Sequence, residues 1–481
     1  MNIRIITSLY SPRFPAAVTY MLQASEYQSA PYLKWLWRTA DFSGVARRRT
    51  LKRTAKARLL ELFLALGMLL EILAGLSLIA YGALSGDNAW AWEIGAALLI
   101  AYPFIWSHLV VLPLEFGRVL IVEPKLNKDI KAAKTIYQNH PGVKIAVAGS
   151  YGKTTMKELL KTVLSEGLKV KATFANKNVL SEHAKFAKSL SGDEDVLIIE
   201  YGEGAPGDVK RFAFNTHPTH GIITGLAPAH LDKYKTLEAA GADIFSLGEY
   251  LKGKNVYVNA ESSQAKAYIK PGYITYGSKG VGEWRVSEVD LNIHGVSFSL
   301  SAGKTKLNLS SKLLGKHQIG ALSLAAVIGL ELGLTHDQVI AGIAKSKPFM
   351  HRMQPYELAG AWVIDDTYNG NIEGIRAGTA LLRELPARRK IYVTPGLVDQ
   401  GQDTKRIHNL MGELIADAKP DLVVLMRNSV TGFIKEGLIS SSYSGELQVV
   451  DDPLNFYEHL DQIVAAGDLV LMQNDWTDNY A

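Results

Sequence analysis

The sequence contains no cysteine among its 481 residues. Disulfide bonds, thiolate zinc sites, iron–sulfur clusters and a cysteine nucleophile are therefore excluded. A disordered or low-complexity chain is also excluded, because 47% of the residues are hydrophobic and only 21% are charged. The length predicts a folded protein of about three domains, at roughly 150 residues per domain.

Charge is unevenly distributed along the chain, although the net charge is only +5. Residues 1–58 carry eleven Lys or Arg and two Asp or Glu, so their charge is +9 and that of the remaining chain is −4. Basic and aromatic residues together, as in residues 1–40, suit either single-stranded nucleic acid or an acidic membrane surface. The apolar segments that follow favour the membrane, and no nucleic-acid partner is expected.

Two long segments almost without charge follow the basic region. Residues 59–84 carry only Glu61 and Glu71 as charged residues, and residues 89–114 carry only Glu93. A spanning helix needs about 20 apolar residues, so we predict transmembrane helices over both segments. Lys and Arg residues on the outer flanks predict a multi-pass protein of the inner (plasma) membrane with its catalytic domains in the cytoplasm. The alternative is a buried helical pair of a soluble domain.

Glu71 lies near the middle of the first predicted span, where a charge costs about 2.5–3.5 kcal/mol. This side chain is therefore expected to face the partner helix, a second copy of the chain or the membrane interface. His108 in the second span is a candidate partner.

A glycine-rich loop follows an apolar strand pattern over residues 143–148, VKIAVA, and precedes a predicted helix over 156–166. Backbone N–H groups bind phosphate in this strand–loop–helix context. Lys153 is expected to reach the β- and γ-phosphates, and Thr154 to offer its hydroxyl to Mg²⁺. The loop thus predicts ATP and Mg²⁺ as cofactors, and its predicted nucleotide-binding residues are Gly149, Ser150, Gly152, Lys153, Thr154 and Thr155.

This short form of the loop, GSYGKTT, is followed by further motifs in a fixed order. Together they resemble the Mur ligase family, the ATP-dependent amide ligases of peptidoglycan precursor synthesis, and within it the branch that adds D-alanyl-D-alanine. The resemblance covers about residues 135–481. It implies that Asn176 and Asn178 bind substrate, that Glu200 binds magnesium and that His230 binds a second metal ion. Glu200 also ends an apolar strand pattern, 196–200, where a hard Mg²⁺ ligand is expected.

The same resemblance assigns residues nearer the C-terminus. The segment GKHQIGA (315–321) is similar to the adenine segment of the family, with both asparagines replaced, and the segments 351–353 and 363–371 are similar to its last two motifs. The implied roles are adenine binding by Gln318, phosphate binding by Arg352, ribose binding by Asp366 and substrate binding by Tyr368 and Asn369. Lys153, His230 and Arg352 are the implied catalytic residues.

The predicted fold class is α/β with three parts. A membrane-associated region with a transmembrane helical hairpin covers 1–121, a P-loop central domain covers 122–346, and a C-terminal Rossmann-like domain covers 347–481. The central domain is expected to hold a parallel sheet with an antiparallel excursion, because residues 284–313 alternate apolar and polar positions. Residues 390–394, 421–426 and 468–472 are expected to be parallel strands of the last domain.

Besides the replaced asparagines, the sequence departs from the family pattern at two places. Gly241 occupies the position of a carbamylated lysine that holds the second metal, and Glu238, three residues earlier, is a candidate replacement. The membrane region also stands where the family has a domain for the UDP end of the substrate. The first departure removes a ligand of the second metal, and the second means that the substrate handle is missing or has moved.

The predicted function is an ATP-dependent, ADP-forming amide or peptide ligase of cell-wall precursor synthesis that acts through an acyl phosphate. Its expected partners are a small-molecule or lipid-linked peptide with a carboxylate, an amine co-substrate, the membrane and proteins of wall synthesis. Two alternatives remain: a membrane ligase for another polymer such as poly-γ-glutamate, and a nucleotide-binding scaffold with little catalysis.

Overall fold

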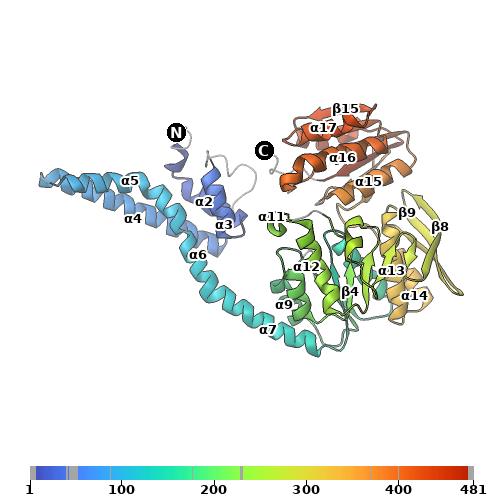
Figure 1. The fold of residues 1–481 in the computed structure, drawn as a ribbon. Helices are drawn as coiled ribbons and strands as arrows, with labels where there is room; N and C mark the ends of the chain where they lie inside the picture. Colours follow the sequence, from blue (N-terminus) through green and yellow to red (C-terminus); the bar gives the residue numbers. More distant parts are fainter. Residues whose placement is uncertain are drawn as a thin grey trace. The chain divides into compact units, whose positions relative to one another are not determined.

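The structure is a computed structural model that describes residues 7–39, 42, 52–86, 88–175, 177–227, 231–368, 370–398 and 400–474. The chain forms two compact units, Met1–Lys128 and Asp129–Ala481. They are described in turn below, and Figure 1 shows the course of the chain through both.

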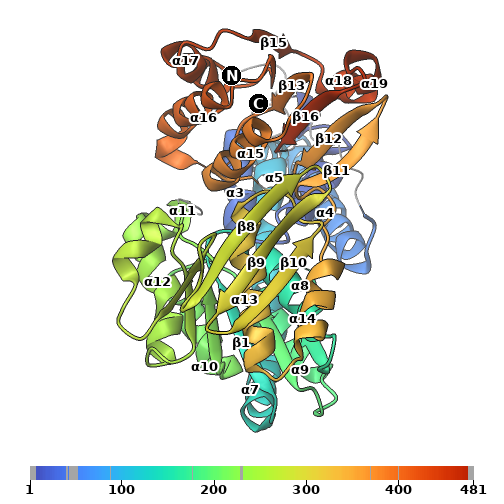
Figure 2. The same ribbon diagram turned by 90° about the vertical axis from the view of Figure 1, so that its right-hand side faces the viewer.

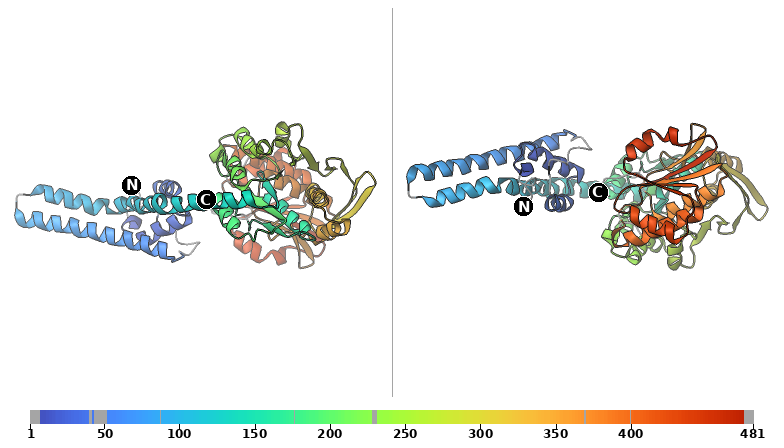
Figure 3. Two further views of the ribbon diagram at one scale, coloured as in Figure 1. Left: turned by 90° about the horizontal axis from the view of Figure 1, so that it is seen from below. Right: turned by 90° about the horizontal axis from the view of Figure 1, so that it is seen from above.

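The first unit is helical throughout the residues described. Its elements are α2 (Phe14–Ala24), α3 (Ser29–Arg38), α4 (Ala55–Ser85), α5 (Ala89–Leu109), α6 (Val111–Gly117) and a π-helical segment η1 (Arg118–Val122), after which α7 (Glu123–Asn139) leads into the second unit. α4 and α5 run antiparallel, side by side (Figure 3). Their seam is lined by glycines, since a Cβ atom on Gly95 would lie 2.7 Å from the carbonyl oxygen of Gly75. Small residues allow such close helix packing.

Large apolar side chains cover the outer surface of α4 and α5. Leu66, Leu69, Leu73 and Leu76 are each about half exposed. By length and composition alone, α4 and the helix that begins at Ala89 are long and apolar enough to cross a membrane, and only 22% of the most apolar window of each is buried. Exposed apolar surface of this extent is typical of a contact with a membrane or with another protein.

Glu71 faces the partner helix of this hairpin. Trp106 of α5 donates a hydrogen bond from Nε1 to Oε2 of Glu71, at 2.6 Å. Trp106 packs over Gly67, where a Cβ atom would lie 2.2 Å from its ring. His108 is not the partner of Glu71: its Nδ1 lies 2.7 Å from the carbonyl oxygen of Phe104, one turn earlier on the same helix.

The second unit contains a ten-stranded sheet of mixed direction. Its strands are β1 (Val143–Ala148), β2 (Val170–Ala172), β3 (Val196–Glu200), β4 (His220–Ile223), β5 (Val256–Asn259), β6 (Ile274–Gly277), β7 (Gly280–Val281), β8 (Trp284–Asn292), β9 (Gly295–Ala302) and β10 (Thr305–Ser311). Their order is β10-β9-β8-β7-β6-β5-β4-β1-β3-β2. Neighbouring strands among β1 to β6 pair in parallel, whereas neighbouring strands among β6 to β10 pair antiparallel. The antiparallel excursion predicted over 284–313 is confirmed.

Helices cover both faces of the parallel part of this sheet (Figure 2). One apolar core joins the sheet to α8 (Lys153–Leu164), α13 (His317–Glu331) and α14 (His336–Lys345). A second core joins the opposite face to the end of α7, α9 (Leu180–Lys188), α10 (Asp208–Thr216) and α12 (Leu237–Tyr250). α11 (Leu231–Tyr234) and a short 3-10 helix, η2 (Ser263–Tyr268), lie in connections between them. Burial on both faces explains why β1 and β3 read as continuous apolar runs.

A six-stranded sheet follows, in the order β11-β12-β16-β13-β14-β15. Its strands are β11 (Gln354–Leu358), β12 (Ala361–Asp366), β13 (Arg389–Thr394), β14 (Leu422–Met426), β15 (Glu446–Val450) and β16 (Asp468–Gln473), all parallel except β11. Its helices are α15 (Ile372–Glu384), η3 (Gly401–Asp403), α16 (Thr404–Ala418), α17 (Thr431–Ser440), α18 (Pro453–Glu458) and α19 (Leu460–Ile463). The three parallel strands expected in this part are confirmed as β13, β14 and β16.

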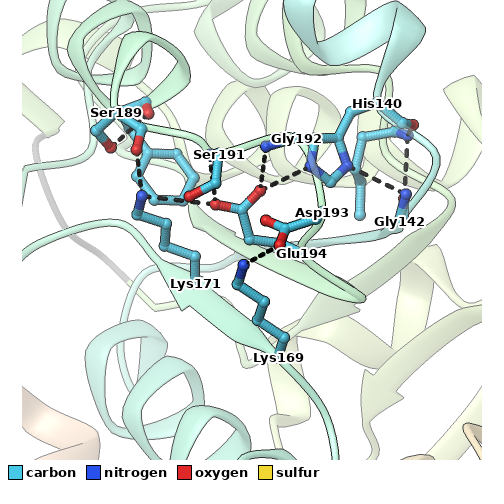
Figure 4. Close-up of polar contacts among 11 residues, drawn as sticks. His140, Gly142, Lys169, Lys171, Ser189, Ser191, Gly192, Asp193 and Glu194 are labelled. Atoms are coloured by element: carbon cyan, nitrogen blue, oxygen red, sulfur yellow. Dashed lines mark hydrogen bonds and ion pairs between the residues drawn. The ribbon is translucent and has the colours of Figure 1, made fainter.

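A buried carboxylate joins the end of α7 to the edge of the ten-stranded sheet (Figure 4). Glu194 accepts hydrogen bonds from the backbone N–H groups of Ser191 (2.8 Å) and Gly192 (2.9 Å) and lies 3.1 Å from Nε2 of His140. Gly142 N–H donates to Nδ1 of His140 at 3.1 Å, so the imidazole is neutral with its proton on Nε2. Burial raises the pKa of Glu194, but the hydrogen bonds outweigh it and hold that pKa well below its usual range.

We expect Glu194→Gln to lower the free energy of unfolding by about 2–4 kcal/mol. The amide of the variant has one acceptor oxygen where the carboxylate has two, so its NH₂ group would lie against buried N–H donors that have lost their acceptor. Since the pKa of Glu194 is lowered by folding, its stabilisation is present above the unfolded pKa and fades as the pH falls. Urea unfolding at several pH values measures both effects. Asp193→Asn is the matched control, because Asp193 is exposed and pairs only with Lys169 at the surface. Equal losses in the two variants would contradict this interpretation.

Candidate functional site

The glycine-rich loop leaves the carboxyl end of β1 and enters α8. Gly149 has a φ of 138°, and a Cβ atom there would lie 2.4 Å from Oγ1 of Thr224, so only glycine fits. Gly152 adopts the left-handed conformation, with φ at 74°. The helix begins at Lys153, three residues earlier than the predicted start at 156. The free N–H groups of its first turn therefore lie in the loop itself, where they favour an anion.

Glu200 ends β3 beside the start of α8. Its Oε1 accepts hydrogen bonds from Oγ1 of Thr154 (3.1 Å) and Nδ2 of Asn178 (3.3 Å). Nζ of Lys157 lies 3.3 Å from Oε2, and both side chains are almost fully buried. The structure thus brings together three predicted residues and one, Lys157, that sequence reasoning missed. Lys157 lies one turn after Lys153 on α8, and this i, i+4 spacing was the available signal.

Lys153 contacts a second buried carboxylate that the sequence analysis also missed. Its Nζ lies 3.4 Å from Oε1 of Glu203 and donates a hydrogen bond to the carbonyl oxygen of Gly149. Ser150 donates from Oγ to Oε2 of Glu203 at 3.1 Å. Glu203 follows Glu200 by three residues after a parallel strand, so its place at the same sheet edge could have been inferred.

The segment between β2 and α9 lies against these carboxylates. Besides its bond to Glu200, Asn178 accepts a hydrogen bond at its carbonyl oxygen from Gly202 N–H, at 2.8 Å. Ala175 has a φ of 47°, and its carbonyl oxygen accepts a hydrogen bond from Lys157. Phe174 is three-quarters exposed. Asn176, the other predicted substrate residue, lies outside the described residues.

A cavity of about 430 Å³ brings the loop together with residues of the six-stranded-sheet region. Its lining includes these predicted site residues: Gly152, Thr155, Gln318, Arg352, Asp366 and Tyr368. The guanidinium of Arg352 lies over the ring of Tyr368, 4.6 Å from its centre. Residues separated by about 200 positions in the sequence therefore line one site.

Asp366 lies at the end of β12, on the floor of this cavity. Gln473 donates from Nε2 to its Oδ2 at 2.8 Å, and Met353 N–H donates to its Oδ1 at 3.2 Å. Burial raises the pKa of Asp366 to about 6, although these hydrogen bonds and the charge of Arg352 oppose the rise. A carboxylate so placed can accept hydrogen bonds from hydroxyl groups of a ligand.

The glycine at the position of the family's carbamylated lysine has a structural explanation. Gly241 lies on the buried side of α12, and a Cβ atom there would lie 2.5 Å from the Tyr268 ring, which stacks on Phe245. Tyr268 therefore occupies the space of a side chain at this position. Glu238 is exposed on the first turn of α12, and its backbone carbonyl oxygen, 3.4 Å away, accepts from the Tyr268 hydroxyl.

The other predicted residues can be placed only in part. His230 and Asn369 lie outside the described residues. Nε2 of Gln318 lies 2.9 Å from Nε2 of His317, and both line the cavity. Ala321 also lines it, so the second asparagine of the family segment has no polar counterpart here.

The donor chemistry near α8 fits a magnesium ion. The hydroxyl of Thr154 and the carboxylate of Glu200 are hard oxygen ligands that lie 3.1 Å apart. Oε2 of Glu200 is buried and accepts no hydrogen bond in the described part of the chain. Within those same ranges no group of three or more His, Asp or Glu side chains forms a closed metal cage. Magnesium usually keeps waters and takes further ligands from nucleotide phosphates, so a partial set is what it requires.

Comparison with known proteins identifies relatives for the second unit. The family model described as Mur ligase middle domain matches residues 147–329, and the model described as Mur ligase, glutamate ligase domain, matches 351–473. The UDP-N-acetylmuramoyl-tripeptide–D-alanyl-D-alanine ligase of Escherichia coli (strain K12) is 27% identical over 353 residues, which cover 70% of this chain and 74% of the relative. The Bacillus subtilis (strain 168) protein of the same name is 22% identical over 80% and 83%.

Solved structures show the same fold. MurF from Acinetobacter baumannii superimposes with a TM-score of 0.64 at 18% identity, over 73% of this chain and 77% of that one. MurF ligase from Thermotoga maritima, solved in complex with ADP, gives 0.63 at 22% identity, over 73% and 80%. Both family models begin after residue 146, so the first unit lies outside the matched domains.

Proposed function

The chain belongs to the Mur ligase family of ATP-dependent ligases, and we propose that it is a membrane-anchored, ADP-forming amide ligase that acts on a cell-wall precursor. The observation that carries this proposal is the cavity in which Gly152 of the phosphate loop faces Arg352 and Asp366. Lys153 and Thr154, which follow Gly152 at the start of α8, and Glu200 at the end of β3 support nucleotide binding beside this cavity.

The proposed reaction has two steps. A carboxylate oxygen of the substrate attacks the γ-phosphorus of ATP, the bond to the β,γ-bridging oxygen breaks, and ADP leaves an acyl phosphate. An amine then attacks the acyl carbon, loses a proton, and expels inorganic phosphate as the amide forms. Magnesium, when bound, lowers the repulsion between the carboxylate and the triphosphate.

The residues of the chain have separate tasks in this scheme. Lys153 and the first-turn N–H groups of α8 bind the phosphates and stabilise the charge that develops on them. Asp366 binds the ribose hydroxyls, and Arg352 adds positive charge on the opposite wall of the cavity. Asn178, which donates a hydrogen bond to Glu200, would bind the substrate beside this magnesium ligand. The cavity walls come from both sheet regions, and they would limit the access of water to the acyl phosphate.

The first unit is proposed to anchor the ligase in the membrane. Half-exposed leucines on α4, and exposed apolar side chains such as Ile94 and Ile100 on α5, would present an apolar surface to lipid, and the basic segment before α4 suits the acidic inner leaflet. The catalytic unit would then face the cytoplasm. A substrate attached to a lipid fits an enzyme whose non-family part is a membrane hairpin; a small-molecule peptide is the other candidate.

Purified full-length protein tests the proposal. It would be supplied with ATP, Mg²⁺, a UDP-N-acetylmuramoyl tripeptide or its lipid-linked counterpart, and D-alanyl-D-alanine. We expect ADP and phosphate only when both the carboxylate and the amine are present. Formation of AMP, or ADP release that is independent of both substrates, would contradict an acyl-phosphate ligase.

The raised pKa of Asp366 predicts a pH dependence of nucleotide affinity. Only the ionised carboxylate accepts from both ribose hydroxyls, and at pH 5, one unit below a pKa of about 6, roughly a tenth is ionised. We expect ADP to bind about tenfold more weakly at pH 5 than at pH 7.5, as measured by calorimetry. Asp366→Asn should bind weakly at both pH values, whereas Asp365→Asn should keep the dependence. A pH-independent wild-type affinity would rule out this role.

A further inference from the structure

Glu203 is a buried carboxylate whose two side-chain partners both belong to the phosphate loop. Oε1 lies 3.4 Å from Nζ of Lys153, and Oε2 accepts from Oγ of Ser150 at 3.1 Å. Its side chain is only 4% exposed. A carboxylate this close to a loop for anionic phosphates requires an explanation, because it repels the ligand that the loop binds.

Two lysines of α8 form ion pairs with carboxylates at and just after the end of β3. Lys157 pairs with Glu200 at 3.3 Å, and Lys153 pairs with Glu203 at 3.4 Å. Glu158 also lies 3.3 Å from Lys157, so carboxylates balance the two lysine charges and these side chains carry no excess positive charge. When nucleotide phosphates take Lys153, Glu203 loses its counter-charge and lies beside a polyanion. An unpaired buried charge is strongly unfavourable, and a divalent cation is the partner that both anions share.

We propose that Glu203 is a further carboxylate ligand of the divalent cation that binds with the nucleotide, and that it exchanges Lys153 for this cation on binding. The inference rests on the proposed function only in taking the loop to bind a nucleoside di- or triphosphate. Two observations favour it. Oε2 of Glu200 is buried and accepts no hydrogen bond in the described residues, and its neighbour there is the ammonium group of Lys157 at 3.3 Å, so this edge holds a second carboxylate oxygen that suits a cation. Gly241 cannot contribute a ligand, because Tyr268 fills the space beside it.

The proposal makes opposite predictions for ADP binding with and without magnesium. Without magnesium, Glu203 competes with ADP for Lys153, so Glu203→Gln should bind ADP at least threefold more tightly than the wild type in EDTA. With magnesium, the variant lacks a cation ligand and should bind ADP about tenfold more weakly. Calorimetry of the full-length protein with ADP, in EDTA and in Mg²⁺, measures both values. The enhancement of ADP affinity by magnesium should therefore fall by about thirtyfold or more.

Glu158→Gln is the matched control. Glu158 is also next to a lysine of α8, with Oε1 3.3 Å from Nζ of Lys157, but it makes no contact with the phosphate loop. This variant should keep the wild-type enhancement by magnesium. Glu203→Asp keeps the charge on a shorter side chain, and it should lose affinity for Mg²⁺ while keeping the weak binding in EDTA. It also serves as the test if Glu203→Gln fails to fold.

Distinct results would overturn the inference. If Glu203→Gln weakened ADP binding equally in EDTA and in Mg²⁺, Glu203 would only support the shape of the loop. If it kept the wild-type enhancement by magnesium, or if Glu203→Asp did, Glu203 would not be a cation ligand. Failure of the wild type to bind ADP under either condition would instead overturn the proposed function itself.

Discussion

Lys153→Ala should lower the rate of ADP release by at least about 10³-fold, because two anions must approach each other in the first step and Lys153 is the phosphate-loop cation. The backbone N–H groups of the loop remain in the variant, so residual nucleotide affinity is expected. A coupled assay for ADP, with both carboxylate and amine supplied, measures the rate. Calorimetry with ADP shows how much of the loss is binding.

The matched control is Lys161→Ala. Lys161 lies two turns further along α8 and is exposed, so its removal should leave the rate within about a factor of two. If Lys153→Ala kept more than a tenth of the wild-type rate while folded, the loop would not be the catalytic phosphate site. Because Lys153 also pairs with Glu203, the melting temperature of the Lys153→Ala variant should be compared with that of the wild type.

The second large effect concerns the hairpin of α4 and α5. Replacing Leu69 and Leu73 together with lysine should abolish stable membrane integration, since each lysine costs about 2.5–3.5 kcal/mol near the centre of a span. Both side chains lie on the exposed surface of α4. Membranes from expressing cells would be extracted with alkaline carbonate. Wild-type protein is expected in the pellet, and the double variant in the supernatant or in aggregates.

The control for this experiment is Leu59→Lys. Leu59 is more exposed than either leucine but lies in the first turns of α4, beside the basic segment. A lysine there would reach the headgroups, so integration should be unchanged. If the double variant remained in the carbonate pellet as fully as the wild type, the hairpin would not be a membrane anchor.

The catalytic core was readable from the sequence because its signals are local. Residues 143–155 hold a buried strand, glycines at positions of positive φ and a helix start within thirteen positions, so the phosphate loop follows from adjacent residues. Parallel strands such as β13 and β14 are equally local, because burial on both faces makes them continuous apolar runs. β15 was missed, since as an edge strand it is only half buried.

The pairing of charges was not readable in the same way. Lys157 and Glu203 are ordinary polar positions in the sequence, and only the packing of α8 against β3 shows that both are buried. The partner of Glu71 was missed for a related reason. The rotation of α5 about its axis decides which of its side chains faces Glu71, and the evenly apolar sequence of α5 does not reveal that rotation. In the structure Trp106 faces Glu71, and His108 does not. Likewise, the space beside Gly241 is filled by Tyr268, which lies 27 residues away in the chain.

Transfer of oxygen from the carboxylate to phosphate tests the central claim most directly. The carboxylate substrate would be prepared with ¹⁸O in both oxygens, converted by full-length protein with ATP and the amine, and the released phosphate analysed by mass spectrometry. An acyl phosphate carries one carboxylate oxygen onto the γ-phosphoryl group, so we predict one ¹⁸O atom per phosphate and unlabelled ADP. Phosphate without ¹⁸O, or label recovered in AMP, would contradict the account.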